Sequence, residues 1–281
     1  MEEAVNVRVA VIGGGRMGAG IAQVFLAEGA WVTVQEADED AARAAAGRIA
    51  KGLRTAEARR PGLRADEALR RLSAGPVPET AELVIEAVPE DPRLKAEVLA
   101  EAEARIGPHA VLATNTSSLS ISELSAALSG PHRLIGLHFF NPVPVQRLVE
   151  IVVTPHTPPE VLDRARKYVE MLGKTGVVVN DSPGFATSRL GVLLGLEAIR
   201  MVEEGVAAAE DIDTAMTLGY NHPMGPLRLG DLVGLDVRLA VAEYLHARLG
   251  PRFEPPALLR DMVARGELGR KSGKGFYVWE S

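Results

Sequence analysis

The first 180 residues alternate between short apolar runs and longer stretches with helical spacing. A β-branched run with almost no charge covers 5–12, and its Val9 and Val11 are typical of a strand buried on both faces. Apolar residues at spacings of three and four follow over 21–27, which predicts a helix closed by Gly29. The same two patterns predict further strands at 31–34, 83–88, 110–113, 134–140, 148–153 and 177–179, and further helices at 38–53, 66–72, 92–106, from Ser120 and at 157–173.

The alternation stops near 181–184, and the chain beyond has helical spacing. Helices are expected at 185–204, 208–218, 232–249 and 256–265. The sequence therefore predicts an α/β fold: a Rossmann-like, mostly parallel sheet domain over 1–182 with a helical hairpin insertion, then an all-α substrate and dimerisation domain over 183–281. The first helix of the C-terminal domain is apolar on most sides. One small helical layer cannot bury so much apolar surface, so the pattern favours a homodimer.

A glycine-rich turn with the spacing G-x-G-x-x-G links the first strand to the first helix. Gly13 permits a tight turn, Gly15 lets the backbone approach a pyrophosphate, and Gly18 lets the helix pack close to the strand. Met17 lies in the same turn and counts among the expected cofactor-binding residues. Glu36 ends the second strand, where a carboxylate accepts from both ribose hydroxyls and repels a 2′-phosphate. These elements together predict an NAD site rather than an NADP site or a purely structural turn.

Composition narrows the class of protein. A net charge of −6 argues against general nucleic-acid binding, which depends on neutralising phosphates. The absence of cysteine excludes disulfides and thiolate chemistry, and it fits a reducing interior. The start, Met1-Glu2-Glu3, lacks the pattern of a signal peptide, and no apolar stretch approaches the roughly 18 residues of a membrane helix. We therefore expect a cytoplasmic protein with no membrane and no nucleic-acid partner.

A basic stretch interrupts this acidic chain. Between Arg48 and Arg71 there are eight basic and three acidic residues, a local net charge of +5. Lys51 and Arg59 belong to this stretch. It is either the solvated face of a helical hairpin or a docking surface for a polyanionic group such as the phosphates of coenzyme A.

None of the six histidines has the spacing of metal ligands, so no metal site is expected. His138 stands out because it lies in an apolar strand, with Glu150 on the strand that returns. A histidine in a strand is often structural. Beside an NAD site, however, the oxidation of an alcohol needs a base for the hydroxyl proton, and a histidine supported by a carboxylate suits that role near neutral pH.

The chain resembles the 3-hydroxyacyl-CoA dehydrogenase family, in particular its short bacterial 3-hydroxybutyryl-CoA type. The matches follow one another in order along nearly the whole chain, and the His-Phe-Phe-Asn-Pro-Val-Pro segment is the most specific of them. The matching segments are 13–18, 86–90, 115–118, 138–144, Glu150, 181–185, 221–226, 234–236 and 271–277.

The resemblance implies NAD-dependent oxidation of an (S)-3-hydroxyacyl-CoA to the 3-ketoacyl-CoA, and the reverse. It implies His138 as the catalytic base and Glu150 as its partner. It also implies a homodimer formed through the helical domain. The further positions that it implies are Ser117 and Asn141 near the reacting hydroxyl and the nicotinamide, Asn115 in the same pocket, Glu90, Lys95 and Lys271 in contact with NAD, and Arg59, with Lys51 in the same basic stretch, in contact with coenzyme A.

Two residues depart from the family pattern. Glu36 replaces the usual aspartate, and its longer arm still accepts two hydrogen bonds. Ser188 replaces an asparagine near the histidine and the substrate, and a hydroxyl offers fewer hydrogen-bonding groups than an amide. Two alternatives follow: a dehydrogenase of a free hydroxyacid, against which the basic stretch argues, and an NAD(H)-binding protein without turnover, which only Ser188 favours.

Overall fold

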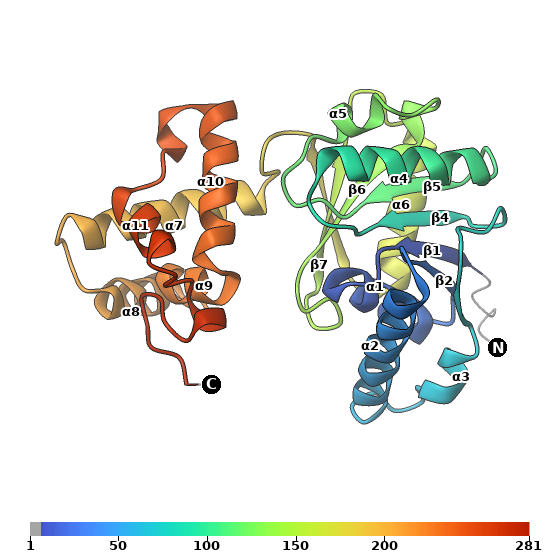
Figure 1. Cartoon of the computed structure of the whole chain (residues 1–281), viewed down its shortest axis with the longest axis horizontal. Coiled ribbons are helices and arrows are strands. Elements are labelled where there is room, and N and C mark those ends of the chain that lie inside the picture. Colours follow the sequence, from blue (N-terminus) through green and yellow to red (C-terminus); the bar gives the residue numbers. More distant parts are fainter. Residues whose placement is uncertain (1–6, 281) are drawn as a thin grey trace. The chain divides into compact units, whose positions relative to one another are not determined.

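The structure is a computed structural model that describes residues 7–280. Position 281, the start of the first predicted strand at Val5, and the acidic start Met1 to Glu3 lie outside the described residues. The chain divides into two compact units, Met1–Ser182 and Pro183–Ser281. The first contains a large sheet and the second is helical (Figure 1).

One eight-stranded sheet organises the first unit. Its strands are β1 (Arg8–Ile12), β2 (Trp31–Gln35), β3 (Leu72–Ala74), β4 (Leu83–Glu86), β5 (Val111–Thr114), β6 (Leu134–Phe139), β7 (Leu148–Val153) and β8 (Thr175–Asn180). They lie in the order β3-β2-β1-β4-β5-β6-β7-β8. All neighbours are parallel except β6 and β7, which are antiparallel. The prediction of a mostly parallel sheet is confirmed.

Helices cover both faces of this sheet, as a parallel sheet requires (Figure 1). They are α1 (Arg16–Ala27), α2 (Glu39–Glu57), α3 (Ala65–Leu69), α4 (Pro92–Arg105), α5 (Ile121–Ser125) and α6 (Pro159–Met171), with a short 3₁₀ turn, η1 (Pro131–Arg133). The central strands β1, β4 and β5 are buried almost throughout, which explains why they lack a polar face in the sequence.

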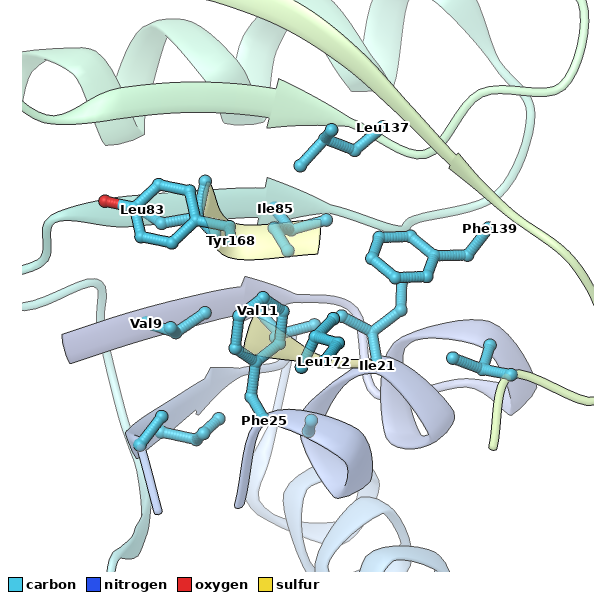
Figure 2. Packing of buried hydrophobic residues seen from close by; sticks show 14 of the residues in the cluster. Val9, Val11, Ile21, Phe25, Leu83, Ile85, Leu137, Phe139, Tyr168 and Leu172 are labelled. Atoms are coloured by element: carbon cyan, nitrogen blue, oxygen red, sulfur yellow. The ribbon is translucent and has the colours of Figure 1, made fainter. Parts of the chain in front are cut away.

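The main core lies between the sheet and helices α1 and α6. Figure 2 shows its side chains in contact from both layers. The strands contribute Val9, Val11, Leu83, Ile85, Leu137 and Phe139, and the helical layer contributes Ile21, Phe25, Tyr168 and Leu172. This core anchors the strands whose carboxyl ends carry the polar loops.

Local sequence sets where several helices begin. The Asp38 side chain accepts from the Ala41 backbone N–H and caps α2. Asp91 caps α4 in the same way, with Pro92 as its first residue. Ser120 caps α5, as the sequence predicts. The predicted start of α6 at Thr157 is wrong, because this helix begins after Pro158.

The second unit is a small helical domain with its own core. Its helices are α7 (Thr187–Glu203), α8 (Ala209–Tyr220), α9 (Pro226–Val233), α10 (Leu235–Leu249) and α11 (Ala257–Ala264), with 3₁₀ turns η2 (Pro251–Phe253) and η3 (Arg270–Ser272). The prediction of one helix over 232–249 is wrong, because Gly234 has φ +107° and separates α9 from α10. Helix α9 was not among the helices expected from the sequence.

The largest difference in the first unit is β3. The sequence pattern predicts a helix over 66–72, but α3 ends at Leu69 and Leu72 opens a strand that pairs with β2. This strand is only three residues long and lies at the edge of the sheet. A segment of that length carries too few positions to show a period of two.

Candidate active site

The glycine turn after β1 is held by close contacts. Gly13 has φ +89°, and a Cβ added there would lie 2.9 Å from the backbone oxygen of Ala87. A Cβ on Gly18 would lie 1.7 Å from the backbone oxygen of Gly13. Both positions therefore require glycine, the first for its backbone angle and the second for the close approach of α1 to the turn.

Gly15 differs from both, because nothing lies within 4 Å of a Cβ placed there. It is the N-cap of α1, so the turn opens outwards where the helix presents its free N–H groups. Met17 is half-buried and packs against the core below. This combination of a closed inner side and an open outer side fits the pyrophosphate of a dinucleotide.

Glu36 follows β2 and reaches back to this turn. Its Oε1 accepts a hydrogen bond of 2.6 Å from the backbone N–H of Gly14. On the other side of Gly14, Nε of Arg48 donates to its carbonyl oxygen at 3.0 Å. Arg48 was not expected in the site, because in the sequence only its place in the basic stretch distinguishes it.

A buried ion-pair network lies at the carboxyl end of β4. Lys95 is 1 % exposed, and its ammonium lies 2.8 Å from Oε1 of Glu86 and 3.2 Å from Oε2 of Glu90. It also donates to the Val88 carbonyl at 3.2 Å. Glu86 is fully buried, and the sequence had not indicated a role for it. An acid that ends an otherwise apolar strand was the signal that could have found it.

Glu90 connects that network to the loop after β5. Its Oε1 accepts from the Thr116 hydroxyl at 2.5 Å and from the Ser117 backbone N–H at 3.0 Å. Burial acts to raise the pKa of the Glu90 carboxyl, but the Lys95 ammonium and the hydrogen bonds from Thr116 and Ser117 outweigh it and lower the pKa below its usual value. Glu90 is therefore an ionised acceptor that organises this loop.

His138 and Glu150 face each other across the antiparallel ladder of β6 and β7. Nδ1 of His138 lies 2.8 Å from Oε2 of Glu150. The imidazole is 7 % exposed and the carboxylate is fully buried. Since an ionised carboxylate only accepts, Nδ1 carries the proton of this bond. The Phe140 ring packs 4.4 Å from the imidazole, centroid to centroid.

Two asparagines flank the histidine strand. Asn115 lies in the loop after β5, and its Oδ1 accepts from the Phe139 backbone N–H at 2.9 Å. Asn141 lies two residues after the end of β6 and is exposed. The loops of Ser117 and Asn141 thus lie at the carboxyl ends of two adjacent parallel strands, the edge at which ligands bind in such sheets.

Lys51 and Arg59 are exposed, the first on α2 and the second just beyond its end. Their neighbour Arg60 forms an ion pair with Glu28. Arg48 and Arg60 are thus bound within the unit, whereas Lys51 and Arg59 extend towards solvent.

The two remaining candidate residues belong to the helical unit. Ser188 is the second residue of α7 and is half-buried. Lys271 lies in η3, and its ammonium pairs with Oδ2 of Asp236 at 2.5 Å.

Among residues 7–280, the structure brings together no group of three or more histidine or acidic side chains that could hold a metal ion. No helix within that range combines the length and the apolar character that crossing a bilayer demands.

Two family models match the chain. The NAD-binding domain of 3-hydroxyacyl-CoA dehydrogenase matches residues 8–182, and the C-terminal domain of the same family matches residues 184–279.

Curated relatives agree along nearly the full length. The chain is 43% identical to a probable 3-hydroxybutyryl-CoA dehydrogenase of Bacillus subtilis over 279 residues, which cover 97% of each chain. Among solved structures it is similar to Mycobacterium tuberculosis FadB2, with a TM-score of 0.92, 44% identity and coverage of 97% of this chain and 99% of that one. It is also similar to the (S)-3-hydroxybutyryl-CoA dehydrogenase PaaH1 of Ralstonia eutropha, with a TM-score of 0.93, 37% identity and coverage of 98% and 99%.

Proposed function

The chain belongs to the 3-hydroxyacyl-CoA dehydrogenase family, and we propose that it oxidises (S)-3-hydroxyacyl-CoA thioesters to 3-ketoacyl-CoA and catalyses the reverse reaction. Membership in the family makes it an NAD-dependent oxidoreductase. The preferred substrate in this proposal is 3-hydroxybutyryl-CoA, the substrate in the names of its relatives. The observation that supports the proposal best is the buried His138–Glu150 pair in the unit that carries the dinucleotide turn.

The turn at Gly13, Gly15 and Gly18, with Glu36 beyond β2, would hold NAD. The open side of Gly15 would receive the pyrophosphate, and Glu36 would accept from the ribose hydroxyls. When bound, the cofactor supplies the hydride acceptor for the oxidised carbon.

His138 takes the hydroxyl proton of the substrate. Because Nδ1 is directed at Glu150, the accepting atom in this proposal is Nε2. The imidazolium that forms is stabilised by the Glu150 carboxylate, which is buried and therefore interacts strongly with it. In the reverse direction the same imidazolium returns its proton to the carbonyl oxygen.

Ser117 and Asn141 orient the reacting group, and Glu90 holds the Ser117 loop in place. Asn115 supports the histidine strand through its bond to Phe139. In the proposal Lys95 and Lys271 serve the cofactor, and Ser188 serves the substrate in place of an asparagine.

Lys51 and Arg59 would bind the phosphates of coenzyme A. Both are exposed cations on the same stretch of the α/β unit, and charge-assisted hydrogen bonds to phosphate are among the stronger polar contacts in water. This surface would distinguish a thioester of coenzyme A from a free hydroxyacid.

We also propose a homodimer formed through the helical unit, in the cytoplasm and in the metabolism of fatty acids. Several large apolar side chains of this unit are exposed: Leu190, Leu193 and Leu194 on α7, and Leu218 and Tyr220 on α8. An apolar surface of this kind supports association. The absence of cysteine is compatible with a reducing compartment.

The decisive experiment follows the absorbance of NADH in the presence of acetoacetyl-CoA and, separately, of free acetoacetate. Oxidation of NADH with the thioester and not with the acid supports the proposal. Preference for the free acid would replace it with a hydroxyacid dehydrogenase. NADH binding without turnover of either compound would indicate a protein that holds the cofactor but lacks activity.

A further inference from the structure

The Lys95 ammonium is an unusual group to find inside a sheet domain. A lysine is rarely fully buried unless its charge is paired. Here three acceptors lie within 3.2 Å of Nζ: a carboxylate oxygen of Glu86, one of Glu90 and the Val88 carbonyl. An ammonium has three N–H donors, so this set of acceptors matches its full capacity.

Glu86 is the innermost member of this set. Its Oε1 also accepts from the Val88 backbone N–H at 2.7 Å, and its Oε2 accepts from the Thr114 hydroxyl at 2.6 Å. Thr114 is itself fully buried at the end of β5. Glu86 therefore joins the carboxyl ends of two neighbouring strands to α4 through Lys95. The proposed reaction gives this buried acid no task.

The contacts continue outwards from Lys95. Glu90 receives the Lys95 ammonium on one oxygen, and with the other it accepts from Thr116 and from the Ser117 backbone. An unbroken series of polar contacts thus runs from Glu86 inside the sheet to the Ser117 loop at its edge. Each link is a hydrogen bond or ion pair of 3.2 Å or less.

The order of the strands indicates which half of a bound dinucleotide would lie beside this series of contacts. The sheet order changes direction between β1 and β4, and dinucleotides lie across such a switch point. The glycine turn and Glu36 lie on the β1 and β2 side, where the adenosine half binds. The nicotinamide half of a bound dinucleotide would therefore lie over the ends of β4 and β5, where Glu86 and Ser117 are.

We propose that Glu86 is a positioning residue that acts through Lys95 and Glu90 to fix the Ser117 loop against the nicotinamide half of NAD. The role in turnover rests on the proposed function, whereas the role in cofactor binding does not. Without the Glu86 charge, Lys95 retains a single carboxylate partner, and Glu90 is held less firmly because the ammonium that it binds is held less firmly. The interactions of the adenosine half remain as they are.

The test compares two ligands on a Glu86→Gln variant. NADH contains the nicotinamide, and ADP-ribose lacks it. The dissociation constant for NADH is expected to rise ~10-fold, because a charge-assisted network loses one ion, while that for ADP-ribose changes less than about twofold. The matched control is Glu82→Gln, which removes an exposed carboxylate beside the opposite end of β4 and should change neither constant.

If Glu86 served folding alone, Glu86→Gln would weaken the binding of both ligands equally or of neither. Either result overturns the proposal. If Glu86→Gln does not fold, Thr114→Val removes the hydrogen bond to Oε2 of Glu86, together with a longer one from the Thr116 backbone N–H, and leaves the ion pair in place. This variant is expected to raise the dissociation constant for NADH about threefold and to leave that for ADP-ribose unchanged. An unchanged NADH constant in Thr114→Val would count against the proposal.

A double substitution tests the order of the contacts. If Glu86 acts only through Lys95, the double variant Glu86→Gln, Lys95→Met binds NADH no more weakly than Lys95→Met alone. Additive losses would mean that Glu86 acts by another route. These measurements use binding alone, so they remain decisive if the unmodified protein turns over no acyl-CoA, and a failure of the proposed reaction is distinguishable from a failure of this inference.

Discussion

The Glu36 carboxylate accepts a hydrogen bond from the Gly14 backbone N–H at 2.6 Å, so the acid expected to bind ribose also holds the glycine turn. Arg48 holds the other side of the same residue by donating to the Gly14 carbonyl. The side chain that holds the turn is therefore also the one that, in the proposed function, would select NAD over NADP.

Removing the charge of Glu36 should weaken the preference for NAD. In Glu36→Gln we expect the dissociation constant for NAD⁺ to rise ~10-fold, because hydrogen bonds to a charged group contribute about 1.5–3 kcal/mol. Binding of NADP⁺ should improve, since the repulsion of a 2′-phosphate is gone. The two constants are measured by fluorescence titration. Glu39→Gln, on the exposed first turn of α2, is the control, and an unchanged ratio of the constants in Glu36→Gln would contradict the assignment.

Replacing His138 should remove the proton acceptor while leaving the cofactor site intact. His138→Ala is expected to lower kcat ~10²–10⁴-fold, the usual contribution of a general base. The dissociation constant for NADH should stay within about twofold. Steady-state assays in both directions, with His132→Ala from the exposed η1 turn as the control, decide the matter. A His138→Ala enzyme as fast as the unmodified one would mean that another group accepts the proton.

Glu90 should give the α/β unit part of its sensitivity to acid. Its pKa is lower in the folded protein than its usual value of 4.5. Its stabilising contribution is therefore complete above pH 4.5 and is lost as the pH falls through the folded value. We expect Glu90→Gln to be less stable than the unmodified protein at neutral pH and to lose less stability on acidification. Urea unfolding over a series of pH values measures both; Glu97→Gln, on the exposed side of α4, should leave the dependence unchanged.

Two exposed cations of the basic stretch, Lys51 and Arg59, should act on coenzyme A alone. In the double variant Lys51→Ala, Arg59→Ala we expect KM for the acyl-CoA to rise ~10-fold or more at low salt. KM for the matching pantetheine thioester, which lacks the nucleotide phosphates, should not change. Arg43→Ala removes a cation that pairs with Glu39 on the same helix and serves as the control. Equal effects on both thioesters would remove coenzyme A from the role given to this surface.

The apolar surface of the helical unit should control association. Leu190 is 67 % exposed, and burying a leucine contributes about 1.5–3 kcal/mol. We expect Leu190→Asp to shift the protein towards monomers in sedimentation velocity at micromolar concentration. Val145→Asp places the same charge on an exposed apolar residue of the α/β unit and should leave the distribution unchanged. A dimer that survives Leu190→Asp would mean that this part of α7 lies outside the interface.

Patterns with many positions were predicted well from the sequence. The buried strands β1, β4 and β5 are uniform apolar runs because helices cover both of their faces. The glycine spacing was equally informative, since Gly13 and Gly18 admit no side chain. The helix starts at Asp38 and Pro92 were readable because a cap is a local interaction.

Interactions between distant segments were less accessible. The hydrogen bond from Arg48 to Gly14 joins residues that are 34 positions apart, and no local sequence pattern indicates it. Glu86 was visible as an acid at the end of an apolar strand, but its partners Lys95 and Thr114 come from a helix and a neighbouring strand. The division between α9 and α10 depends on the positive φ of Gly234, which residue type alone did not reveal.

The opposed placement of His138 and Glu150 on the β6–β7 ladder has a consequence for how such a protein can change. A shift of the register by one residue would turn the acid towards the other face of the sheet, and a shift by two would carry it a full pleat away. The backbone pairing of the two strands therefore sets the distance between the two side chains. This distance does not depend on the conformation of the loop between the strands. Changes in the exposed part of that loop, at 144–147, can therefore occur while the His138–Glu150 pair stays where it is.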